Sequence, residues 1–172
     1  MPHLPRLARD QFDLAWRLWE YHASRLEPDD FCWEPAPLCW TMRRSPDGSW
    51  VPDFAEVEPD PVPAATIAWL TWHLGWWLGT ATDHLTGATP RSRGDVAWPG
   101  PGEPTLAWLH DLADSWRSGL ATSPGDRPVG FPWPPDAAKT TADLVGWVNM
   151  ELMKNVAEIG QLRILRTAQR TG

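Results

Sequence analysis

The chain has 172 residues, fourteen of them tryptophan, and its 22 acidic and 15 basic residues give a formal net charge of −7. This length fits one domain, and we expect it to span residues 1–172 with a hydrophobic core that needs no disulfide or metal. The scattered, outnumbered basic residues exclude a nucleic-acid-binding surface, and the lack of a long uncharged apolar run or a signal-peptide pattern predicts no membrane partner and a cytoplasmic location.

Helical spacing of leucine and aromatic residues predicts a first helix over residues 6–26. The following stretch, residues 27–63, is rich in proline and has few periodic positions, so we expect a long ordered loop with short extended pieces, packed across one end of the domain. Cys32 and Cys39 lie in this loop without a second pair. Their spacing indicates neither a zinc knuckle nor a disulfide framework, and a single bridge between them is compatible with it but is not indicated.

Three further helices follow. We expect the second from about Ala64 to Thr86, with prolines before it and Gly87 just past its end. The third covers about residues 103–121, and the last begins after an N-cap at Thr140 or Thr141 and continues to about residue 170. No segment alternates like a strand for long. The predicted fold class is therefore all-α, a four-helix bundle of antiparallel type with long proline-rich loops.

Polar residues on the inward faces of two helices suggest a site. The period of the last helix places Asn155 among its apolar positions, with Glu151 at the edge of the same face. On the second helix, His73 shares a face with Trp77, and Trp69 precedes it by one turn. A buried amide and carboxylate need partners, and the inward histidine is the nearest candidate. These five residues are the predicted ligand pocket.

Two interpretations of this cluster stay open on spacing alone: a structural hydrogen-bond network inside a wet cleft, which is the more common arrangement, or a binding site. His22 ends the first helix, where a histidine is most often a surface cap interacting with the helix dipole, although it also lies on a side that can line the cleft. The sequence contains no glycine-rich phosphate loop, nucleophile elbow or paired-histidine zinc motif, which argues against nucleotide, triad-hydrolase and metalloprotease functions.

Three segments carry a family resemblance: PVPAATIAWLTWHLGWWLGTATDHLTG, FCWEPAPLCWTMR and NMELMKNVAEIGQLRILR. Together they resemble the DinB-like superfamily of YfiT-like four-helix bundles, in particular its actinobacterial members, over nearly the whole chain. The resemblance implies a divalent metal held by three histidines, one on the second helix and two spaced i, i+4 on the last. Some relatives are thiol-dependent transferases or isomerases that use bacillithiol, mycothiol or glutathione.

Carried onto this chain, the first of those histidines matches His73, and the other two positions fall on Glu151 and Asn155. One imidazole, one carboxylate and one amide oxygen make a poor zinc site, and Lys154 adds a positive charge beside them. We therefore assign no metal ligand and expect no cofactor in the isolated protein beyond a weakly held divalent ion such as zinc or nickel.

Two function classes follow from the resemblance and the degenerate triad. The favoured one is a bundle that binds a small molecule after losing the three-histidine metal site. The alternative is a low-molecular-weight-thiol, mycothiol-type S-transferase or a related metal-dependent enzyme, so whether the chain is an enzyme stays open. The expected partners are a small-molecule ligand and, as an option, a second copy of the chain in a homodimer.

Overall fold

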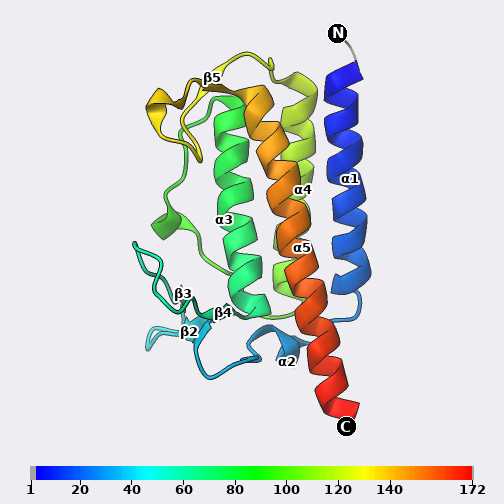
Figure 1. Cartoon of the computed structure of the whole chain (residues 1–172), viewed down its shortest axis with the longest axis vertical. Helices are drawn as coiled ribbons and strands as arrows, with labels where there is room; N and C mark the ends of the chain where they lie inside the picture. Colours follow the sequence, from blue (N-terminus) through cyan, green and yellow to red (C-terminus); the bar gives the residue numbers. More distant parts are fainter. Residues whose placement is uncertain (1–2, 172) are drawn as a thin grey trace.

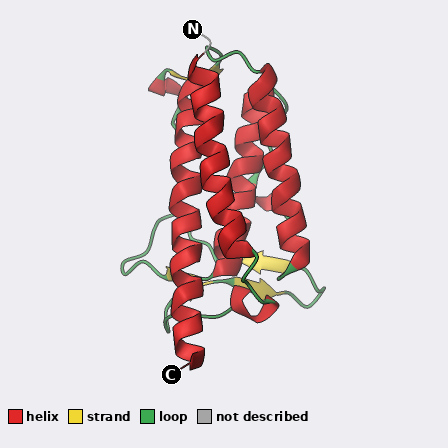
Figure 2. Ribbon diagram, turned by 90° about the vertical axis from the view of Figure 1, so that its right-hand side faces the viewer, coloured by secondary structure: helices red, strands yellow, loops and turns green. Residues whose placement is uncertain are grey.

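Four long helices lie side by side and make up most of the protein (Figures 1 and 2). The computed structural model describes residues 3–171. The long helices are α1 (His3–Ala23), α3 (Ile67–Thr86), α4 (Glu103–Thr122) and α5 (Thr141–Thr171). The expected all-α four-helix bundle is confirmed.

The helix directions differ from a simple antiparallel bundle. The sequence colours of Figure 1 show that α1 and α5 run one way and that α3 and α4 run the other. Helix α1 packs mainly on α5, and α3 packs on α4 and α5. Two neighbouring pairs, α1 with α5 and α3 with α4, are therefore parallel. This arrangement arises because the connection between α3 and α4, residues 87–102, returns along the outside of the bundle, as one crossover in such bundles can.

Short elements cover the end of the bundle where α1 stops and α3 starts (Figure 1). They are α2 (Pro28–Phe31), β1 (Cys39–Trp40), β2 (Met42–Arg44), β3 (Trp50–Pro52) and β4 (Ala64–Ala65). Strand β1 pairs with β4 in parallel, and β2 pairs with β3 in an antiparallel ladder. Phe31 and Met42 anchor this layer because their side chains are buried in the core. The prediction of an ordered loop across one end is thus confirmed, with both cysteines present as free thiols.

Two smaller segments complete the chain. One turn of 3-10 helix, η1 (Arg93–Asp95), lies in the crossover. At the other end of the bundle, β5 (Pro128–Val129) pairs antiparallel with β6 (Lys139–Thr140), and η2 (Pro135–Ala137) lies between them. Asp83 fixes the crossover to α3, because its carboxylate accepts hydrogen bonds of 2.7 and 2.8 Å from the Arg91 guanidinium.

Local chemistry sets the ends of α3. The Thr66 hydroxyl accepts a hydrogen bond from the Trp69 backbone N–H at 3.3 Å, so the helix starts at residue 67 rather than at residue 64 as predicted. The two alanines before Thr66 pair with β1 instead. The helix ends at Gly87, whose φ of 81° is the left-handed conformation that glycine adopts without strain.

Tryptophans fill the centre of the bundle. The largest side chains with less than 2% exposure include five of them, Trp16, Trp19, Trp72, Trp77 and Trp116. Such rings bury a large apolar area each and so account for much of the hydrophobic stabilisation. Within the described residues, no helix is both long and apolar enough to cross a membrane.

A close contact between α1 and α5 explains the glycine of the AEIG segment. A Cβ built on Gly160 would lie 2.4 Å from Nε2 of His22, which is only 8% exposed. The Arg163 Nε–H donates to Nδ1 of the same ring at 3.3 Å. Burial, followed by the charges of Arg163 and Arg25, lowers the His22 pKa. The surface-cap interpretation of His22 was therefore wrong, because glycine at 160 makes room for the imidazole between the helices.

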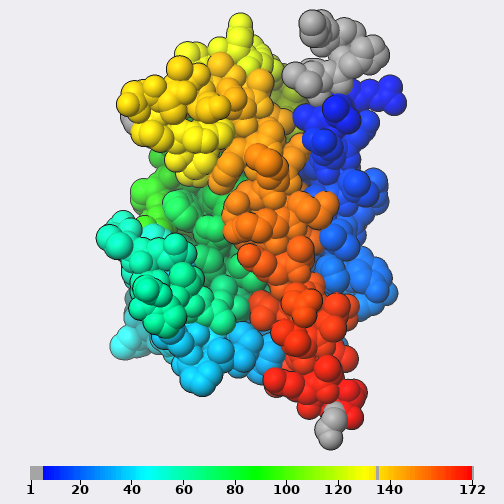
Figure 3. Space-filling view, viewed as in Figure 1, coloured from blue at the N-terminus to red at the C-terminus, as the bar shows by residue number. Residues whose placement is uncertain are grey.

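Helix α5 occupies the middle of the face seen in Figure 3, with α1 on one side and α3 on the other. Its apolar stripe faces inward as predicted, since Val148, Leu152 and Ile159 are fully buried. Asn155 lies in the same stripe and is also 0% exposed. A fully buried amide between apolar neighbours has to be hydrogen bonded, and its partners define the candidate site.

Candidate functional site

Three of the five predicted residues form one hydrogen-bonded cluster between α3 and α5. The His73 Nδ1 atom lies 3.4 Å from Oδ1 of Asn155. The Asn155 amide Nδ2 donates to the Glu151 backbone carbonyl at 2.8 Å and to its carboxylate Oε1 at 3.0 Å. His73 and Glu151 are half-buried. The cluster therefore runs from the fully buried Asn155 outward in two directions.

The chemistry of these contacts sets the proton positions. Both groups that face Nδ2 of Asn155 are pure acceptors, so the amide nitrogen must point at Glu151 and the amide oxygen must point at His73. A hydrogen bond between Oδ1 and Nδ1 then needs the proton on Nδ1 of the imidazole. In the neutral ring, Nε2 is left with its lone pair. Within the described chain Nε2 has no hydrogen bond, and the His73 side chain is only partly buried, so Nε2 is free to accept one.

Lys154 closes the other end of the cluster. Its ammonium Nζ lies 2.9 Å from Glu151 Oε1 and 4.0 Å from Glu158 Oε1. The nearer pair gives the Glu151 carboxylate two donors, the Asn155 amide and the Lys154 ammonium. Because one cation and one anion cancel, the chain of Lys154, Glu151, Asn155 and neutral His73 carries no net charge.

Aromatic rings enclose the imidazole of His73. Trp69 stacks on it with 4.8 Å between ring centroids and an interplanar angle of 18°, and Trp76 lies tilted at 5.8 Å. Trp77 instead packs edge-on against Trp147 at 5.4 Å. The structure thus brings Trp69 to the histidine as predicted, adds Trp76, and places Trp77 deeper in the core. The i, i+3 spacing from His73 to Trp76 was a signal that sequence reasoning missed.

Burial dominates the titration of His73. It lowers the imidazole pKa from 6.5 to about 4. The hydrogen bond with Asn155 and the Glu151 charge act in the opposite direction, and the Lys154 charge adds to the lowering. The ring is therefore neutral at pH 7, and it can accept a hydrogen bond at Nε2.

These donors do not fit the metal that the family resemblance implies. Across residues 3–171, no group of three or more histidine, cysteine, aspartate or glutamate side chains is placed to hold a metal ion. Only His73 supplies an imidazole, the Asn155 oxygen faces that ring, and the Lys154 ammonium lies against the Glu151 carboxylate. A divalent cation at this position would have to displace the ammonium and break the hydrogen-bond chain.

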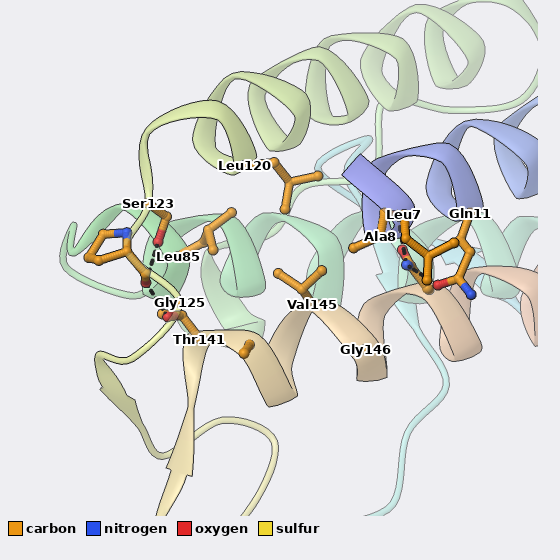
Figure 4. A pocket seen from close by; sticks show the side chains of 13 residues that line it. Leu7, Ala8, Gln11, Leu85, Leu120, Ser123, Gly125, Thr141, Val145 and Gly146 are labelled. Atoms are coloured by element: carbon orange, nitrogen blue, oxygen red, sulfur yellow. Dashed lines mark hydrogen bonds between the residues drawn. The ribbon is translucent and has the colours of Figure 1, made fainter. Parts of the chain in front are cut away.

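A separate cavity of about 220 Å³, open to solvent on one side, lies between α1, α4 and α5, toward the end of the bundle where α5 begins, and Leu85 of α3 also lines it (Figure 4). None of the five residues predicted as the ligand pocket lines this cavity. Its wall includes Ala142, Gly146 and Asn149 of α5, which sequence reasoning also missed. The available signal was a run of small residues and one amide along one side of the last helix.

Comparison with known families gives one match. The model described as the DinB superfamily matches residues 11–159 of the 172. The matched range contains the whole polar cluster, from His73 on α3 to Asn155 on α5. No curated protein matches the chain.

Proposed function

The chain belongs to the DinB superfamily, and from this premise we propose that it binds a small neutral molecule at His73 instead of a catalytic metal. The observation that carries the proposal is the fixed imidazole. Asn155 holds the proton on Nδ1, and Nε2 remains an open acceptor beside two indole rings. A recognition site of this kind combines an apolar wall with a few placed polar groups.

Charge selects the ligand class. The cluster is neutral overall because Lys154 pairs with Glu151 at 2.9 Å and the pKa of His73 is about 4. An anion gains no attraction from a neutral imidazole, and a cation meets the Lys154 ammonium beside Glu151, the carboxylate that is hydrogen bonded to Asn155. A neutral ligand that donates one hydrogen bond to Nε2 satisfies the site without desolvating a new charge.

The arrangement of the aromatic rings around His73 narrows the ligand class further. The Trp69 ring is nearly parallel to the imidazole, and the Trp76 ring is tilted by 57° relative to it. Offset-stacked and edge-on contacts with such rings favour a flat, apolar body. The proposed ligand is therefore a planar, uncharged molecule with an O–H or N–H group at its edge.

Binding of 2-naphthol tests this proposal. The probe is planar, neutral at pH 7 and carries one O–H donor, whereas naphthalene-2-sulfonate has the same ring system with an anionic group and no donor. Isothermal titration and ligand-observed NMR should show that the protein binds 2-naphthol and rejects the sulfonate. His73→Phe keeps an aromatic ring and removes Nε2, and it should weaken binding of 2-naphthol about tenfold, the effect of roughly one hydrogen bond.

A matched variant separates this site from the rest of the bundle. His84→Phe changes another half-buried histidine, which stacks on Phe131 at 5.5 Å and lies outside the cluster. It should leave the affinity for 2-naphthol unchanged. Equal affinities of the parent and of His73→Phe would contradict the proposal, as would preferential binding of the sulfonate.

Thiol-dependent transfer is the second candidate, and one observation favours it: the open Nε2 of His73 can accept a proton. The free energy of that proton transfer argues against it. A base with a pKa of about 4 takes the proton of a thiol of pKa about 8.5 at a cost of about 6 kcal/mol. Conjugation of glutathione to monochlorobimane should therefore proceed at the uncatalysed rate with this protein, and a His73-dependent acceleration would favour the transferase.

A further inference from the structure

The cavity at the end of the bundle where α5 begins is apolar, and the residues that line it explain why the space is there. Leu7, Leu85, Leu120 and Val145 supply its apolar wall, and Figure 4 shows their side chains around a common space. Small residues line the same space where larger ones would fill it. They are Ala8, Gly125, Ala142 and Gly146.

Gly146 is an exposed residue of α5 that lines one side of this space. A Cβ built on this residue has no other heavy atom within 4 Å, in contrast to Gly75, where the Trp108 ring would lie at 1.8 Å. Glycine inside a helix is unfavourable by about 1 kcal/mol relative to alanine. At Gly75 the close helix contact explains the glycine, whereas at Gly146 no packing contact requires it.

Most polar groups of the cavity wall already have partners. The Thr141 and Ser123 hydroxyls both donate to the Pro124 carbonyl. The Asn149 Nδ2 donates to the Ala8 carbonyl at 2.8 Å and to the Gln11 side-chain oxygen at 3.2 Å.

One acceptor is left over. Because the Ala8 carbonyl can only accept, the Asn149 amide must face it with its nitrogen, and the amide oxygen Oδ1 points elsewhere. This oxygen is buried and has no hydrogen-bond partner among the described residues, and the residue as a whole is 8% exposed. An unsatisfied buried acceptor costs about 1–3 kcal/mol. Because Asn149 lines the cavity, a donor bound there would recover this energy by pairing with Oδ1.

We propose that this cavity is a second binding site, for a small neutral molecule with an apolar body and one hydrogen-bond donor. Its volume of about 220 Å³ exceeds the roughly 150 Å³ that holds a benzene molecule in an engineered cavity, and it is below the range of drug-sized pockets, about 300–1,000 Å³. The matching body is a single aromatic ring or a short aliphatic chain. Asn149 selects an alcohol, phenol or amine over a hydrocarbon.

The test compares p-cresol with toluene, which differ mainly in the O–H donor. Isothermal titration and ¹H–¹⁵N spectra of the full chain should show p-cresol bound, with shifted amides at the start of α5 and the end of α4. Toluene should bind about fivefold or more weakly, the effect of one hydrogen bond to Asn149. In Asn149→Leu the two affinities should become equal.

Cavity-filling variants locate the site. Gly146→Leu and Ala142→Leu each place a larger side chain in the wall and should weaken p-cresol binding about tenfold or more by occupying the space. Ala157→Leu adds the same bulk to an exposed position of α5 outside the cavity and should leave binding unchanged. His73→Phe should leave the p-cresol-induced shifts of amides at the start of α5 and the end of α4 unchanged, which separates this site from the one proposed above.

Two results would overturn the proposal. One is a lack of p-cresol binding to the parent protein at millimolar concentration. The other is undiminished binding in both folded filling variants, Gly146→Leu and Ala142→Leu, with their folds checked by the same ¹H–¹⁵N spectra.

Discussion

Protonation of His73 should destabilise the folded protein. Burial lowers the imidazole pKa from 6.5 to about 4, so between these values the unfolded chain binds more protons than the folded one. Stability then rises with pH in this window. The contribution of the neutral ring is fully present above pH 6.5 and is lost as the pH falls toward 4.

The size of the effect follows from the same two values. The difference between 6.5 and about 4 corresponds to about 3 kcal/mol. About 2 kcal/mol of this develops between pH 7 and pH 5, where most carboxylates are still ionised. Urea unfolding followed by tryptophan fluorescence at pH 7, 6 and 5 measures it.

The variant His73→Gln isolates this contribution. Glutamine does not titrate in the window, and its amide can still donate to Asn155. Burial also lowers the pKa values of His22 and His84, but both proteins share these groups, so the difference between the two stability curves reports His73. The parent should lose about 2 kcal/mol more than the variant between pH 7 and pH 5. Parallel curves would refute the buried, neutral state of the ring.

Three substitutions test the packing and the metal argument. Gly146→Ala should raise the free energy of unfolding by about 0.5–1 kcal/mol, because helix propensity improves and the new Cβ meets no atom; an unchanged or lowered value in urea unfolding would contradict this. Gly160→Ala should lower it by about 1–3 kcal/mol, since its Cβ would meet His22 at 2.4 Å, and equal stability of the variant would speak against the close contact. The double variant Glu151→His with Asn155→His restores a three-imidazole face and should bind nickel or zinc at least about tenfold more tightly than the parent by isothermal titration; equal affinities would remove the basis for the metal argument.

The sequence predicted the helices well because each carries its own local signals. Leucine periodicity and the glycine after Thr86 define α3 within three residues of its observed bounds. The inward position of Asn155 followed from the 3.6-residue period alone, and its full burial agrees with this. The relative directions of the helices were harder to predict, because no local pattern in residues 87–102 indicates that this segment runs the length of the bundle.

Contacts between helices were the least predictable feature. The burial of His22 depends on Gly160, which is 138 positions away in the chain, so a reading of the first helix alone places that histidine at the surface. The Asn149 contact with Ala8 joins the same two helices over a similar separation. By contrast, Trp76 and His73 are one turn apart on α3, and their contact could have been read from spacing.

The most direct test of the proposed site is the proton position on His73. A long-range ¹H–¹⁵N correlation spectrum of the imidazoles at pH 7, with His73→Gln used for assignment, reports which ring nitrogen is protonated. The hydrogen-bond chain through Asn155 predicts a neutral ring with the proton on Nδ1 and an unprotonated Nε2. A proton on Nε2 with Nδ1 bare, or a doubly protonated ring at this pH, would contradict it.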